Sequence, residues 1–195
     1  MKIGIDLDGV VVDTYRHTIK FYNSLFKSEI GIEEFPAHTK MVKYLIGTYS
    51  FEEEQAKKYW YDNMLQIFSE ARPLEGATET INKLSQDHEV YFISAREDLP
   101  GVREVTERWL ADNDIVVDNN LFLTQGSKGI FAKNMGIDLF IEDAPHHIKS
   151  LVHEGIEVFI MRTSYNINTI YNSSCYVTNW NQILSKVEEL CPNYR

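Results

Sequence analysis

The chain has 195 residues, enough for one domain with a sizeable core or for a domain that carries an insertion. Its net charge of −10 disfavours nucleic-acid polymers and anionic membranes as partners, and no apolar run approaches the roughly 20 residues that span a bilayer. The first residues lack a signal-peptide pattern, and Cys175 and Cys191 have no metal-ligand spacing. We therefore expect a cytoplasmic protein with reduced thiols.

Five short, continuous apolar runs predict strands that are buried on both faces, as in a parallel sheet covered by helices. Helical patterns alternate with these runs from residue 76 onward, and Ser127 and Gly136 mark the expected ends of one such helix. The alternation predicts right-handed crossovers and an open, mostly parallel α/β sheet. The predicted strands are 3–7, 90–94, 121–124, 139–143 and 158–161, and the predicted helices are 76–88, 101–114, 127–136 and 144–155.

Residues 14–72 interrupt this rhythm, because they contain no clear strand and many helix-forming residues. Ser50 and Glu53 form a capping-box pattern that predicts the start of the last helix in the segment. Pro73 and Gly76 mark the return to the alternating pattern. We therefore expect a small all-helical cap, residues 14–72, inserted after the first strand of an α/β core that comprises residues 1–13 and 73–195.

Polar residues gather where the predicted strands end. In an open parallel sheet, ligands bind beyond the carboxyl ends of the strands. Carboxylates brought together there repel one another unless a cation lies among them, and oxygen ligands without a cysteine or a histidine pair suit Mg²⁺. These strand ends therefore predict a site for phosphate and a metal; they carry Asp6, Asp8 and Gly9, then Ser94 and Arg96, then Lys128, and finally Glu142 and Asp143.

Two details of this site follow from geometry. Asp6 and Asp8 would point to opposite faces of a regular strand, so both reach one site only if the chain curls after Leu7, which Gly9 permits. Lys128 and Lys133 differ by roughly 140° around a helix and cannot both face the site. We expect Lys128 to face it, because it lies at the helix N-terminus, beside the strand ends.

Several segments resemble the haloacid dehalogenase-like phosphatases. "DLDGVVVDT" is similar to their DxDGxxxD signature, "YFISAR" to their hydroxyl-bearing second motif, and "SKGIFAKNMGIDLFIEDAP" to their lysine followed by a strand and an acidic pair. "RPLEGATETINKL" resembles the segment that re-enters the core after the cap. The resemblance covers nearly the whole chain and implies a doubly wound, Rossmann-like sheet with the first strand central. "GIDLFIEDAP" and the cap length resemble the 5'(3')-deoxyribonucleotidase branch, which includes bacterial nucleotidases.

The resemblance implies a Mg²⁺-dependent phosphomonoester hydrolase acting on (deoxy)nucleoside monophosphates. Asp6 matches the nucleophile that forms a phosphoaspartyl intermediate, and Asp8 matches the general acid/base. Ser94 and Lys128 match the phosphate clamp. The Mg²⁺ shell is implied to comprise Asp6, the backbone carbonyl of Asp8 and Asp143, supported by Glu142 and Gly9. Relatives often have Asp-Asp where this chain has Glu142-Asp143, and an arginine where it has Ala144.

The contacts of the substrate's leaving group are less defined. Arg96 is a candidate for contact with phosphate or substrate, or for pairing with a surface acid, and Phe68 is a candidate pocket aromatic in an aromatic-rich cap. His146 and His147 are interpreted as solvated, because adjacent helical side chains diverge by about 100°.

Other functions stay open at this stage. They are a phosphatase for a sugar phosphate or phosphoglycolate, a receiver-like phosphoacceptor domain, and a binding protein without turnover. A receiver domain would place its acidic pair at the first strand and its acceptor on a middle strand, and it needs no helical insertion. An exposed face of the cap could support a homodimer, but no segment signals one.

Overall fold

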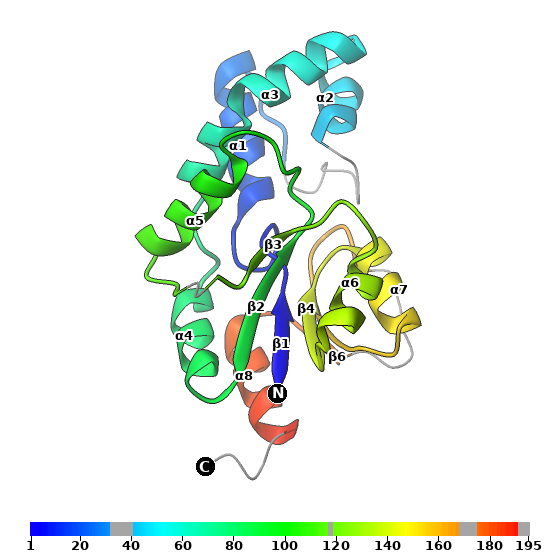
Figure 1. The fold of residues 1–195 in the computed structure, drawn as a ribbon. Coiled ribbons are helices and arrows are strands. Elements are labelled where there is room, and N and C mark those ends of the chain that lie inside the picture. The colour runs from blue at the N-terminus through cyan, green and yellow to red at the C-terminus, as the bar shows by residue number, and fades with distance from the viewer. Residues whose placement is uncertain (32–40, 117–118, 168–174, 191–195) are drawn as a thin grey trace.

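The computed structural model describes residues 1–31, 41–116, 119–167 and 175–190 (Figure 1). Their strands form one six-stranded sheet in the order β3-β2-β1-β4-β5-β6, and every pair of neighbours is parallel. The sheet confirms the predicted α/β class and places the first strand between the two halves. The strands are β1 (Lys2–Ile5), β2 (Glu89–Ser94), β3 (Leu121–Leu123), β4 (Leu139–Glu142), β5 (Glu157–Met161) and β6 (Cys175–Val177).

Helices cover both faces of the sheet. One core cluster joins strand residues such as Ile5 to Trp109 and Trp180 from α5 and α8, and a second joins Phe140 and Ile148 on the opposite face. Figure 1 shows α4 and α8 on one side of the strands and α6 and α7 on the other. The sheet is therefore doubly wound, as the continuous apolar runs predict. The helices are α4 (Ala77–Asp87), α5 (Val102–Asp112), α6 (Lys128–Met135), α7 (Pro145–His153) and α8 (Trp180–Leu190).

Three further helices lie beyond one end of the sheet (Figure 1): α1 (Thr14–Phe26), α2 (Met41–Tyr49) and α3 (Glu53–Glu70). They pack around a core of their own that includes Tyr22, Tyr44 and Ile67. The chain leaves and re-enters the sheet domain at one place, because the Asp13 N–H donates to the Arg72 carbonyl at 2.9 Å. These contacts support the proposal that residues 14–72 form a cap on a core of residues 1–13 and 73–195.

Both predicted ends of one helix are confirmed, and the predicted start of another is wrong. Ser127 caps α6 by accepting the Ile130 N–H, and Gly136 ends that helix in the left-handed region, as expected. The capping box is wrong: α3 begins at Glu53, and Ser50 has a φ of 55°, outside the extended conformation that an N-cap residue adopts.

The sequence analysis also missed β6 and α8. A three-residue strand such as β6 gives almost no periodic signal, whereas the apolar residues Trp180, Ile183 and Val187 recur at helical spacing and could have predicted α8. Cys175 is a free thiol, whereas Cys191 lies outside the described residues. Within the described part of the chain, no helix is both long enough and apolar enough to cross a bilayer.

Candidate active site

The chain curls immediately after β1. The Asp6 N–H still donates to the Ile141 carbonyl of β4, but the N–H groups of Val11 and Val12 both turn back to the Leu7 carbonyl at 2.9 Å. Gly9 lies in this turn with a φ of +88°, a conformation that glycine adopts without strain. The predicted curl is present, and it directs both Asp6 and Asp8 into one cleft between the core and the cap.

Lys128 occupies the centre of the charged group. Its Nζ lies 2.6 Å from Asp6 Oδ1 and 2.7 Å from Glu142 Oε2, and both the Lys128 and Glu142 side chains are fully buried. Lys133, by contrast, pairs with Glu154 on the surface. Burial and the Glu142 carboxylate raise the pKa of Asp6, although Lys128 opposes this shift. One lysine therefore neutralises only part of the negative charge collected at the end of β1 and β4.

The acidic group has the chemistry of a divalent cation site. One carboxylate oxygen from each of Asp6, Glu142 and Asp143 lies within 4.8 Å of the others. Glu142 is already satisfied, because Oε1 accepts the N–H groups of Asp143 and Ala144 while Oε2 accepts from Lys128. Asp143 Oδ1 is buried, and no hydrogen bond reaches it from the described residues. An acidic group in which one member has an unpaired buried carboxylate oxygen fits a hard cation such as Mg²⁺.

The loop after β5 adds residues that the sequence reasoning missed. The Tyr165 hydroxyl donates to Asp143 Oδ2, and the Asn166 amide donates to the Asp143 carbonyl at 2.8 Å. Burial, together with the Glu142 and Asp6 charges, raises the pKa of Asp143 well above its usual range. The fifth predicted strand, 158–161, ends at the same edge of the sheet and leads into this loop, so the position of the loop could have been predicted from the sequence.

Arg96 is bound differently from either sequence interpretation. Its Nε and Nη2 donate to both oxygens of Asp8, at 2.9 and 2.7 Å, and its Nη1 donates to Thr106 at 2.9 Å. The guanidinium also stacks on the Phe68 ring, 3.9 Å from its centroid. Arg96 therefore pairs with an acid of the site rather than with a surface acid, and its fork is not left open for a substrate.

Asp8 is held as a carboxylate by these contacts. Burial would raise its pKa, but the Arg96 charge and the hydrogen bonds from Arg96 and Thr14 lower it below the usual value. Ser94 lies nearby at the end of β2, fully buried, and its hydroxyl accepts the Arg96 N–H at 3.1 Å. The second motif thus supplies both a buried hydroxyl and the cation that fixes Asp8.

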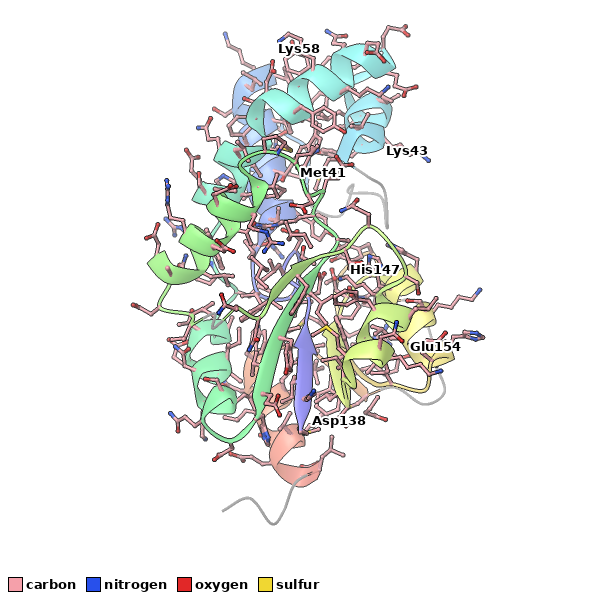
Figure 2. The ribbon with its side chains drawn as sticks, in the orientation of Figure 1. Met41, Lys43, Lys58, Asp138, His147 and Glu154 are labelled. Carbon is pink, nitrogen blue, oxygen red and sulfur yellow. The ribbon has the colours of Figure 1, made fainter. Side chains whose placement is uncertain are left out.

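A cleft of about 980 Å³ lies between the core and the cap, within the size range of small-molecule sites. Figure 2 shows Met41 on its cap side and His147 on its core side. The His146 and His147 rings do not diverge as expected, since their centroids are 3.9 Å apart. The lining includes Asp6, Asp8, Arg96 and Tyr165 from the core and Trp60, Tyr61, Met64 and Phe68 from the cap.

Comparison with known proteins places this geometry in a family. The model of the family described as "5' nucleotidase, deoxy (Pyrimidine), cytosolic type C protein" matches residues 1–189. The chain belongs to this family. A nucleotidase from Clostridium acetobutylicum is 26% identical over 190 residues, which cover 97% of this chain and 95% of that protein. A provisionally named nucleotidase from Oceanobacillus iheyensis is 28% identical over 189 residues, which cover 94% of this chain and 97% of that protein.

Solved structures share the fold. A HAD family hydrolase from Deinococcus radiodurans, with bound phosphate and sodium, has a TM-score of 0.71 at 14% identity, covering 96% of this chain and 95% of that chain. A haloacid dehalogenase-like hydrolase from Streptococcus pneumoniae has a TM-score of 0.69 at 12% identity, covering 95% and 97%. The chain thus has the fold of these hydrolases and, by its family, is a phosphoric monoester hydrolase of the nucleotidase branch, as its motifs indicated.

Proposed function

We propose that the protein is a Mg²⁺-dependent phosphatase that hydrolyses nucleoside monophosphates, 5'(3')-deoxyribonucleotides among them, through a phosphoaspartyl intermediate. One observation carries the proposal: Asp6, which lines a cleft with aromatic side chains in its cap wall, contacts the buried Lys128 and belongs to an acidic group in which Asp143 has an unpaired oxygen. Membership of the nucleotidase family supports the substrate class.

The first half of the reaction is assigned to Asp6 and Asp8. A carboxylate oxygen of Asp6 forms a bond to phosphorus while the bond from phosphorus to the substrate oxygen breaks. The departing alkoxide takes a proton from Asp8, which must carry that proton when the substrate is bound, although Arg96 favours its carboxylate form in the free protein. The Lys128 ammonium and the Ser94 hydroxyl are assigned to the phosphoryl oxygens, whose charge they would stabilise during transfer.

The second half regenerates the enzyme. Asp8, as a carboxylate, takes a proton from water, the resulting hydroxide attacks phosphorus, and the bond to Asp6 breaks to release phosphate. The pairing of Asp8 with Arg96 favours the ionised form that this step needs.

The residues that would hold Mg²⁺ are Asp6, Asp143 and the backbone carbonyl of Asp8, and Glu142 stands behind them with both oxygens already bonded. When bound, Mg²⁺ supplies positive charge that offsets the crowded carboxylates and the phosphoryl oxygens.

The cap wall is assigned to recognition of the base. Trp60, Tyr61 and Phe68 line the cleft, and stacking of a base on an aromatic ring is worth roughly 1–3 kcal/mol. Phe68 lines the cleft, and Arg96 covers one face of its ring.

A substrate panel tests the proposal. Nucleoside monophosphates, sugar phosphates and phosphoglycolate are assayed with wild type and Asp6→Asn, each with Mg²⁺ and with EDTA. We expect hydrolysis that prefers nucleotides and that is lost in the variant and in EDTA. Equal rates for sugar phosphates would sink the nucleotide assignment, and turnover that survives both the substitution and the chelator would overturn the mechanism. The cytoplasmic location and a homodimer stay predictions, the latter open to light scattering.

A further inference from the structure

The loop at residues 162–167, which follows β5, is anchored beside the acidic group. Asn166 is buried, and its amide donates to the carbonyls of Asp143 and Met161, both at 2.8 Å. These two acceptors lie at the ends of β4 and β5, so the amide ties the loop to two neighbouring strands. The backbone of Tyr165, one residue earlier, is therefore held next to Asp143.

Tyr165 distinguishes the two carboxylate oxygens of Asp143. Its hydroxyl donates to Oδ2. The Asp143 N–H donates to Glu142 at 3.1 Å, and the Asp143 carbonyl accepts from Asn166. In the described part of the chain, Oδ1 is thus the one polar atom of Asp143 without a hydrogen bond. One carboxylate oxygen of Asp143 also belongs to the acidic group that contains Asp6 and Glu142.

Gly9 makes the approach of this pair possible. A Cβ at Gly9 would overlap Asp143 Oδ2 and would lie 2.7 Å from the Tyr165 hydroxyl oxygen and 2.9 Å from the Tyr15 ring. Tyr15 meets the Tyr165 ring edge-on, with centroids 5.4 Å apart. The Gly9 backbone on one side and the Tyr15 ring on the other therefore restrict the position of the Tyr165 hydroxyl.

We propose that Tyr165 is a positioning residue for the cation: it binds Asp143 Oδ2 so that Oδ1 is free and oriented for Mg²⁺. The inference rests on the proposed function for the identity of the cation. Groups that hold a metal ligand from behind typically change metal affinity by about 10–100-fold when removed. Tyr165 lies in the loop that follows β5, and no motif within that loop marks it.

Tyr165→Phe tests this directly, because it removes one oxygen and keeps the ring. Mg²⁺ is titrated into chelator-stripped protein by calorimetry, without substrate. We expect a Kd about 10–100-fold higher than for wild type, with Tm in EDTA unchanged. Activity at saturating Mg²⁺ should return close to the wild-type kcat, since the substitution weakens the cation's binding and not the chemistry. Tyr91→Phe is the matched control, because the Tyr91 hydroxyl donates to Glu89 away from the cleft.

Each other outcome has a definite meaning. An unchanged Mg²⁺ affinity in Tyr165→Phe overturns the inference, and so does a lowered kcat that excess Mg²⁺ fails to restore. If Tyr165→Phe lowers Tm in EDTA, Tyr165→Leu is compared at the same Mg²⁺ concentrations; equal affinity for the two variants and wild type again overturns it. Wild type that binds Mg²⁺ but hydrolyses no phosphomonoester would refute the proposed function alone, because the affinities are measured without turnover.

Discussion

The core side and the cap side of the cleft differ in how their side chains are held. On the core side, Lys128 bridges Asp6 and Glu142 and Arg96 clamps Asp8, and all of these groups are buried or nearly so. On the cap side, the wall consists mainly of aromatic and apolar side chains such as Trp60 and Met64, and its charged members among the described residues are Lys43, Glu53 and Lys57. Lys58 and Asp62 of α3 pair with one another in solvent.

This difference predicts separate roles for the core side and the cap side of the cleft. Buried charges that satisfy one another have one stable arrangement, and losing one member leaves its partners uncompensated. Aromatic surfaces tolerate exchange more readily, because stacking is not strongly directional. Substitutions in the core side should therefore change stability and kcat, whereas substitutions in the cap wall should change KM and substrate preference.

Lys128→Met should have the largest effect on folding. It removes the only buried cation that contacts Asp6 and Glu142 within the described residues, and breaking such a pair costs about 3–5 kcal/mol. We expect that loss in the free energy of unfolding, measured by urea denaturation, and no detectable hydrolysis. Lys133→Met is the matched control on the same helix, because Lys133 is exposed and pairs with Glu154. Equal stability of the two variants would contradict the proposed dependence of the carboxylates on Lys128.

Arg96→Lys should have a smaller effect, because it keeps the positive charge but loses the several N–H donors and the planar surface of the guanidinium. An ammonium cannot donate to both Asp8 oxygens, reach Thr106 and stack on Phe68 at once. We expect a loss of about 2 kcal/mol in unfolding free energy, in the range of hydrogen bonds to charged groups, and a fall in kcat with little change in KM. A rise in KM with unchanged kcat would instead indicate that Arg96 contacts the substrate. Arg103→Lys on α5 is the control.

Much of the core could be predicted from the sequence, because its signals are local. Each continuous apolar run became a strand, and the residue after each run lies at the same edge of the sheet. Parallel strands present their carboxyl ends together, so Asp6, Lys128 and Asp143 could be placed near one another without coordinates. The choice of Lys128 over Lys133 needed the angle between successive helical residues and the place of Lys128 at the helix N-terminus.

What could not be predicted depends on contacts between distant segments. The partner of Arg96 is Asp8, 88 residues away, and the ring beneath it comes from the cap. The cap orientation that brings Phe68 there is set by packing of α3 against α5, where Phe68 meets Val102. No periodicity within one segment encodes such a contact. The strand-end rule reaches the loop after β5, but no pattern within that loop indicates that Tyr165 is the residue that contacts Asp143.

Trp60→Leu should affect substrate binding by the cap wall without affecting catalysis on the core side. Trp60 lines the cleft and meets Phe68 edge-on, with ring centroids 5.7 Å apart. If a base stacks on this wall, the KM for nucleoside monophosphates should rise about 5–150-fold, equivalent to the roughly 1–3 kcal/mol of one stacked base. The kcat should stay within about twofold, and sugar phosphates should be unaffected. Trp60→Phe should recover most of the affinity. An equal loss for sugar phosphates would mean that Trp60 only supports the packing of the cap.

Lys58→Ala, on the same helix as Trp60, should have the smallest effect. Figure 2 shows Lys58 at the outer end of the cap, and it pairs with Asp62 one turn along α3, both side chains being more than half exposed. An exposed pair of this kind is screened by water and salt and contributes little. We therefore expect the Tm, kcat and KM of wild type. A rise in nucleotide KM comparable to that of Trp60→Leu would show that any disturbance of α3 weakens binding, and the assignment of base recognition to the aromatic wall would then fail.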